Sequence, residues 1–195
     1  MLFRSDSWTA AGAFCARRNP ALRIRTKHNL KRVRTTLPNR LLYRRVLEHL
    51  IAPSAPVQAH LLASGLAAPE RLHLVWYGID LERYRTTTAR RAECRRRLLE
   101  RFPPAPEALL AVYVSRLTER KHPEHAIEAI RALSAKGCGR PVRLVLAGND
   151  ATECGGRCRV LAGADPGIVF LGFQEDVRPI LAGADLFLLP APEEA

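Results

Sequence analysis

The chain has 195 residues, of which 47% are hydrophobic and 26% are charged, so its composition is that of a globular protein with one large domain or two modest ones. No apolar run reaches the length of about 18 residues that a membrane-spanning helix needs. The formal net charge of +12 is uneven, with +9 on residues 1–80 and +3 on residues 81–195. A basic first part suits an anionic partner such as phospholipid headgroups, a phosphorylated acceptor or nucleic acid. Because zinc-finger spacing and RNA-binding aromatic motifs are missing from the sequence, nucleic acid is not the partner we expect.

The first part of the chain alternates short apolar runs with helical patterns. We expect a helix over residues 7–18, and then strands over residues 22–26, 50–52 and 72–76. Pro38 suits the first turn of a helix whose apolar stripe contains Leu41, Leu42, Val46 and Leu47. Ser54 and Gly65 are placed to cap and to end a helix over residues 55–64.

The amino-acid composition changes after Asp80. Residues 82–101 are highly charged with few apolar positions, and prolines at 103, 104 and 106 interrupt the chain. We interpret the charged segment as a surface helix and place a domain boundary near residues 78–84. This boundary gives a first domain over residues 1–80 and a second over residues 81–195.

The second part repeats the order of strand followed by helix. Strands are expected at residues 109–114, 142–147, 168–171 and 186–189, and helices at residues 124–136, 158–162 and 177–184. The strands are almost continuously apolar, which indicates a sheet buried on both faces. The fold class is therefore α/β with doubly wound parallel sheets. We expect a piece of a longer protein, because the predicted helices leave one face of the second sheet bare.

The loop between the first of these strands and its helix carries three cations within residues 115–121. Ligands of parallel sheets bind at the carboxyl ends of the strands, where helix N-termini favour anions. Arg116 and Lys121 are therefore placed to bind a phosphate. The alternative is a pair of solvated loop cations.

The five cysteines form an odd set without the spacing of a disulfide framework, and are Cys15, Cys94, Cys138, Cys154 and Cys158. We interpret them as free thiols in a reducing compartment, and the N-terminus does not resemble a signal peptide. Cys154 and Cys158 form a C-x3-C pair, but no second ligand pair stands near them in the sequence. A metal site there is the alternative, and we predict none.

Four segments in the same order resemble the nucleotide-sugar glycosyltransferases of family 4, the group 1 family with the two-domain GT-B fold. The first two segments are residues 51–54 and residues 76–80 with Tyr84. The other two are residues 114–117 with Lys121 and residues 170–173 with the residues up to Glu194. The spacing of this last segment is similar to that before the family's E-x7-E motif. Tyr77 stands where the family usually has asparagine, and Ser115 where glycine is common. Residues 5–8 and 25–28 are similar to a subgroup associated with lipopolysaccharide and other cell-surface glycans.

The resemblance implies two Rossmann-like domains, both incomplete here, and a donor site in the second. Arg116 and Lys121 match the pair that holds the donor diphosphate, whose developing charge needs cations when no metal supplies them. The backbone at Gly172 and Phe173 is expected to face the nucleoside base. Gly148 stands where close approach to the donor is expected, with a simple turn glycine as its alternative.

Two further residues are implied as catalytic by the resemblance. Glu194 matches the first glutamate of E-x7-E, which contacts the transferred sugar, and Glu193 beside it is the alternative. The second glutamate would fall beyond Ala195. His28 matches a histidine of the first domain at the interdomain cleft, with an ordinary structural histidine as its alternative.

The function implied is a retaining, metal-independent transfer of a sugar from a nucleoside diphosphate to a glycan or lipid-linked acceptor, with no cofactor. We expect a cytoplasmic protein that associates peripherally with an anionic membrane face, and little or no turnover from these residues alone. The alternatives are a sugar-nucleotide epimerase of the same fold and a basic nucleic-acid-binding module.

Overall fold

The computed structural model describes residues 22–28 and 33–192, and their contacts form two compact units, of which the first ends at Ile79 and the second spans Asp80–Pro192. The helix expected over residues 7–18 lies outside the described residues, and so does Glu194. Among the residues that the structure describes, none of the helices combines the length and the apolar character that crossing a membrane requires.

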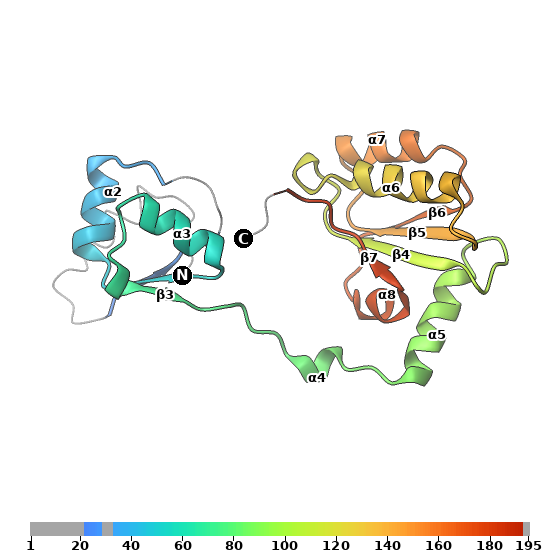
Figure 1. Ribbon diagram of the computed structural model, residues 1–195, viewed down its shortest axis with the longest axis horizontal. Helices are drawn as coiled ribbons and strands as arrows, with labels where there is room; N and C mark the ends of the chain where they lie inside the picture. Colours follow the sequence, from blue (N-terminus) through green and yellow to red (C-terminus); the bar gives the residue numbers. More distant parts are fainter. Residues whose placement is uncertain (1–21, 29–32, 193–195) are drawn as a thin grey trace. The chain divides into compact units, whose positions relative to one another are not determined.

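The first unit contains a three-stranded parallel sheet (Figure 1). Its strands, in spatial order, are β1 (Ile24–Thr26), β2 (His49–Ala52) and β3 (Leu72–Leu74). The connections hold α2 (Leu37–Leu41), the π-helix η2 (Leu42–Val46), α3 (Ala55–Ala63) and the 3-10 turn η3 (Pro69–Arg71). The three predicted strands are confirmed, although β1 and β3 are shorter than expected.

Helix α3 begins and ends as its flanking residues predict. The hydroxyl of Ser54 accepts a hydrogen bond from the amide of Val57 at 3.5 Å, and Pro56 lies in the first turn. Gly65 follows the helix with a φ of 63°, a conformation that glycine adopts without the steric cost of a side chain. Val57 and Leu61 are fully buried on the inner side of this helix.

The helix expected after Pro38 is confirmed in position, and most of its apolar stripe is buried. α2 passes directly into η2, where the amide of Leu47 donates to the carbonyl of Leu42, five residues back, at 2.9 Å. This wider turn changes which side chains face the core. Leu42, Val46 and Leu47 of the expected apolar stripe are buried, whereas Leu41 is 47% exposed and Tyr43 is buried instead, at 1% exposure.

The second unit is built on a four-stranded parallel sheet in the order β6-β5-β4-β7. The strands are β4 (Leu109–Val114), β5 (Val142–Ala147), β6 (Ile168–Gly172) and β7 (Leu186–Phe187). Helices α6 (Pro123–Lys136) and α7 (Glu153–Ala162) cover one face, and α5 (Thr88–Leu99) and α8 (Arg178–Gly183) cover the other (Figure 1). The doubly wound α/β class is confirmed, and the expectation of a bare face is wrong.

The covering of the second face comes from the charged segment that we expected to be a surface helix. That segment divides into α4 (Leu81–Tyr84) and α5, and α5 buries Cys94 and Leu98 beneath its many arginines. α5 also packs closely on α8, since a Cβ at Gly183 would lie 2.8 Å from the backbone nitrogen of Arg95. The narrow apolar stripe formed by Cys94 and Leu98 is therefore sufficient for α5 to pack on the second sheet.

Strand β7 differs from its prediction in length and burial. It ends at Phe187, and its two side chains are 40% and 48% exposed. Within the described part of the chain it pairs only with β4, as an edge strand, so one side has no neighbouring strand. An edge strand is buried less completely than a central one, which explains the difference.

Candidate functional site

The loops after β4, β5 and β6 meet at one edge of the sheet of the second unit. These strands are adjacent and parallel, so their carboxyl ends coincide. The amide of Ser115 donates to the carbonyl of Ala147 at 3.1 Å, and the amide of Gly148 donates to the carbonyl of Gly172 at 2.8 Å. Of the residues singled out from the sequence, Arg116, Lys121, Gly148 and Phe173 lie on these loops, and Gly172 is the last residue of β6.

Gly148 lies at the closest approach between two of these loops. A Cβ at this position would be 1.8 Å from the carbonyl oxygen of Ser115 and 2.8 Å from Cδ1 of Leu117. Contacts of this kind exclude any side chain at residue 148 unless the backbone moves. The glycine is therefore required by the packing of the strand ends, whatever its further role.

Tyr113 supports the loop that carries Arg116 and Lys121. This side chain is fully buried, and its hydroxyl lies 3.3 Å from the carbonyl oxygen of Arg116 and 3.4 Å from that of Lys121. Burial raises the pKa of Tyr113 well above its usual range, so the hydroxyl keeps its proton as a donor. The two ends of the basic loop are thereby fixed over one buried group.

A second contact joins the basic loop to α7. The hydroxyl of Thr152 donates to the carbonyl of Leu117 at 2.7 Å and accepts from the amide of Gly155 at 2.9 Å. The same side chain therefore caps α7 and supports the loop, and it explains why α7 begins at Glu153, five residues before the predicted helix. Thr152 followed directly by Glu153 is the local sequence signal for this earlier start. The prediction from sequence did not use this signal.

The junction between the loop and α6 has an uncommon backbone. His122 has a φ of 46° and is the only non-glycine residue with positive φ in the part of the chain that the structure describes. Its ring stacks on that of His125, with ring centroids 4.8 Å apart. Residues other than glycine with positive φ are uncommon, although histidine is among the types enriched there, and such residues cluster at functional sites. The positive φ of His122 could not be predicted from the sequence, because the residue type alone does not determine the backbone conformation.

The charges around the loop leave Arg116 available. Its side chain is exposed and makes no ion pair within residues 22–28 and 33–192. Two acidic groups on these loops are engaged elsewhere: Asp150 pairs with Arg159, and Glu119 lies 3.2 Å from Arg157. An uncompensated guanidinium at the carboxyl edge of a parallel sheet is suited to bind an anion.

The end of β6 supplies an aromatic side chain. Gly172 has a φ of 68°, and the side chain of Phe173 that follows is 76% exposed. Gln174 fixes this turn by donating from Nε2 to the carbonyl of Leu171 at 2.8 Å. An exposed ring beside a basic loop can stack on a nucleobase.

The two catalytic candidates lie away from these loops in the chain. His28 follows β1 in the first unit, where its Nδ1 lies 2.5 Å from the hydroxyl of Tyr77 and the two rings stack. This contact joins His28 to the segment in which Tyr77 replaces an asparagine. Glu194 lies outside the described residues, so the structure does not place it.

One group of side chains in the second unit has the atoms to hold a metal ion. Glu124, Cys154 and Cys158 bring a carboxylate oxygen and two sulfur atoms within 4.8 Å of one another. Burial raises the pKa of Cys154 to about 11 and that of Cys158 to about 12, so both are neutral thiols at pH 7 without an ion. Burial alone would raise the pKa of Glu124, but hydrogen bonds, including those from Cys154 and Arg157, lower it.

Comparison with solved structures defines the fold. A glycosyltransferase from Rickettsia africae ESF-5 superimposes with a TM-score of 0.78 at 16% identity, covering 97% of this chain and 50% of that one. Anabaena Alr3699/HepE in complex with UDP gives a TM-score of 0.75 at 20% identity, covering 97% and 52%. A TarM variant from S. aureus, in complex with Fondaparinux, alpha-GlcNAc-glycerol and UDP, gives 0.62 at 10% identity, covering 93% and 34%. The chain has the GT-B fold of these glycosyltransferases and spans about half the length of the first two.

The sequence matches a family model over part of the chain. Residues 108–195 match the family described as "Glycosyl transferases group 1", which confirms the resemblance found in the motifs. No curated protein sequence matches the chain. The match covers most of the second unit, from residue 108 onward.

Proposed function

We propose that this chain takes part in the transfer of a sugar from a nucleoside-diphosphate sugar to a glycan or lipid-linked acceptor. The observation that carries the proposal is the basic loop of residues 115–121, fixed over the hydroxyl of Tyr113 at the carboxyl edge of the second sheet. On this proposal, the loop binds the donor diphosphate. The family match and the fold support the same function.

The chemistry of the reaction explains why such a loop is needed. When the sugar leaves, negative charge develops on the departing nucleoside diphosphate, and fixed cations stabilise that charge. Arg116 can form paired hydrogen bonds to phosphate oxygens, and Lys121 adds a second positive charge. Because the backbone of the loop is already held by Tyr113 and Thr152, little ordering is required when the donor binds.

UDP is the donor nucleotide to test first, because Anabaena HepE and the S. aureus TarM variant were solved with it. In this proposal the ring of Phe173 and the backbone at Gly172 contact the base, and Gly148 allows the donor to approach the strand ends. Glu194 would contact the transferred sugar, and His28 is proposed as a second catalytic residue. Retention of configuration and independence from metal follow from the family resemblance and belong to the proposal.

The basic first part supports a location at the inner, anionic face of a membrane. Its formal charge of +9 over residues 1–80 would attract anionic headgroups and bring the protein to a lipid-linked acceptor of cell-surface or lipopolysaccharide synthesis. Cosedimentation with anionic vesicles should fall steeply as salt rises. Binding that is unchanged at high salt would contradict an electrostatic attachment.

The proposal is tested by calorimetric titration of the full chain with UDP, ADP and GDP, with uridine as the matched ligand that lacks phosphates. We expect one nucleotide to bind saturably and uridine to bind much more weakly, because the phosphates supply most of the contacts. A chain that melts cooperatively but binds none of the three nucleotides would contradict the proposal. Salt-sensitive binding to duplex DNA in place of nucleotide binding would favour the nucleic-acid alternative.

A further inference from the structure

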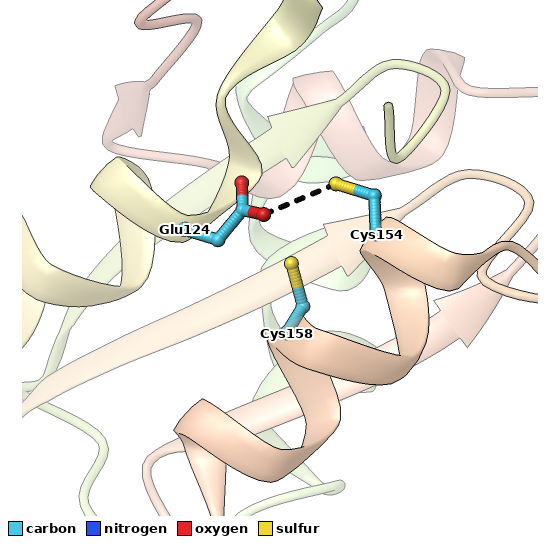
Figure 2. A group of neighbouring side chains, drawn as sticks. All are labelled: Glu124, Cys154 and Cys158. Atoms are coloured by element: carbon cyan, nitrogen blue, oxygen red, sulfur yellow. Dashed lines mark hydrogen bonds between the residues drawn. The ribbon is translucent and has the colours of Figure 1, made fainter. Parts of the chain in front are cut away.

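Three potential metal ligands converge between α6 and α7. Cys154 and Cys158 are separated by four residues on α7, so both lie on the same side of that helix. Glu124 lies in the first turn of α6. Figure 2 shows the carboxylate of Glu124 directed toward the two sulfur atoms, and the thiol of Cys154 donates to its Oε1 at 3.2 Å.

Packing alone does not account for this arrangement. The exposed fractions of Cys154 and Cys158 are 5% and 0%, and both belong to the core between the sheet and these two helices. Cysteine can fill such a position as a small apolar residue. An ionisable carboxylate with only 23% of its side chain exposed, facing two sulfur atoms, is not what an apolar contact requires.

The geometry points to a zinc site formed by Glu124, Cys154 and Cys158, with three protein ligands. A tetrahedral ion with Zn–S bonds of about 2.3 Å and Zn–O bonds of about 2.1 Å places its ligand atoms about 3.5 to 3.8 Å apart. The three ligand atoms lie within 4.8 Å of one another, so side-chain rotations that move these atoms by about an ångström allow all three to bind one ion. The partly exposed side of Glu124 gives the ion a path from solvent and leaves the fourth position to water.

A bound ion would offset most of the charge of its ligands. Two thiolates and one carboxylate carry three negative charges, and a zinc ion reduces the net charge to one negative charge. Arg157 lies beside this charge, with its guanidinium 3.3 Å from Oε1 of Glu124, and it also pairs with Glu119 and Glu153. A group that hydrogen-bonds a ligand from outside also fixes its orientation, as Arg157 does here.

Such an ion would join the first turn of α6 to α7 next to the basic loop. Glu124 follows Lys121 by three residues, so the ion would fasten the end of that loop to a second helix. The inference does not rest on the proposed transferase activity. It replaces the expectation from sequence that these thiols bind no metal, since the third ligand comes from a helix that is distant in sequence.

The test is a titration of the metal-free full chain with Co²⁺ in reducing buffer, followed by displacement with Zn²⁺. We expect one Co²⁺ per chain, thiolate-to-cobalt charge-transfer absorption in the near ultraviolet, and its loss when Zn²⁺ is added. Because other thiols can contribute, the same signal must persist in a chain with Cys15→Ser, Cys94→Ala and Cys138→Ser.

Adding Cys158→Ser to that background should weaken Co²⁺ binding at least about tenfold and remove most of the charge-transfer absorption. Glu124→Gln, which changes a partly exposed side chain and keeps its shape, should also weaken binding. It serves as the deciding variant if Cys158→Ser does not keep the far-ultraviolet circular dichroism of the parent. Absence of the absorption in the parent, or its full retention in Glu124→Gln and Cys158→Ser, would overturn the inference.

Discussion

Gly148 and Ser115 lie in backbone contact at the ends of two adjacent strands, where a Cβ on Gly148 would be 1.8 Å from the carbonyl oxygen of Ser115. The contact fixes the start of the basic loop relative to the loop after β5. It also means that residue 148 is sensitive to the smallest possible substitution.

Gly148→Ala should therefore destabilise the second unit by at least about 2 kcal/mol, because the added methyl group can be accommodated only by a backbone shift. Urea unfolding followed by circular dichroism measures this loss. The matched control is Gly156→Ala, where nothing lies within 4 Å of the added Cβ and the residue is inside α7. That control should be neutral or stabilising by about 0.5–1 kcal/mol. Equal effects of the two substitutions would disprove the close contact.

Thr152→Val should lower the free energy of unfolding by about 1–2 kcal/mol. The substitution removes both the cap on the amide of Gly155 and the hydrogen bond to the carbonyl of Leu117. Thr152→Ser keeps the hydroxyl and should remain within about 0.5 kcal/mol of the parent. Equilibrium urea unfolding of the three proteins distinguishes loss of the hydroxyl from loss of the methyl group.

The stability contributed by Asp185 should depend on pH. Its carboxylate accepts hydrogen bonds from the amide of Leu110 at 2.8 Å and from Arg95 at 2.7 Å, and so ties the start of β7 to β4 and α5. Partial burial alone would raise the pKa of Asp185, but these two donors lower it below its usual range. Since the folded pKa is depressed, the stabilisation is present above the unfolded pKa of about 3.9 and is lost as the pH falls through the folded value.

Asp185→Asn should thus lower the urea midpoint at pH 6 and have a smaller effect near pH 3, below the unfolded pKa. Glu128→Gln, which changes an exposed carboxylate on α6, is the control and should change the midpoint little at either pH. A deficit of Asp185→Asn that is the same at both pH values would show that the charge of the carboxylate does not matter.

Much of the second unit could be predicted from sequence, because its strands are short, apolar and separated by clear breaks. β4 and β5 begin and end where the apolar runs do, and α6 differs from its predicted start by one residue. α5 was harder to interpret, since its arginines dominate the composition while Cys94 and Leu98 alone provide the buried stripe. The packing of α5 on α8 depends on Gly183, and no local pattern reveals that contact.

The candidate site was predictable only in part, for a physical reason. Arg116 and Lys121 were found because a basic loop after a buried strand is a local pattern, and the family resemblance gave them a role. The supports of that loop were missed. In the sequence, Tyr113 looks like any other strand residue. Thr152 hydrogen-bonds to Leu117, which is 35 residues away in the sequence. Likewise, Cys154 and Cys158 had no visible third ligand until α6 brought Glu124 beside them.

The proposed donor site depends most directly on Arg116 as a ligand of the diphosphate. Calorimetry should compare the affinity of the bound nucleotide for the parent chain, Arg116→Ala and Arg120→Ala, the last being an exposed cation on the same loop. Loss of a charged hydrogen bond costs about 1.5–3 kcal/mol, so Arg116→Ala should weaken binding about 10- to 100-fold. Arg120→Ala should change it by less than about threefold. Equal affinity in the parent and in Arg116→Ala, with both proteins folded, would contradict the proposed donor site.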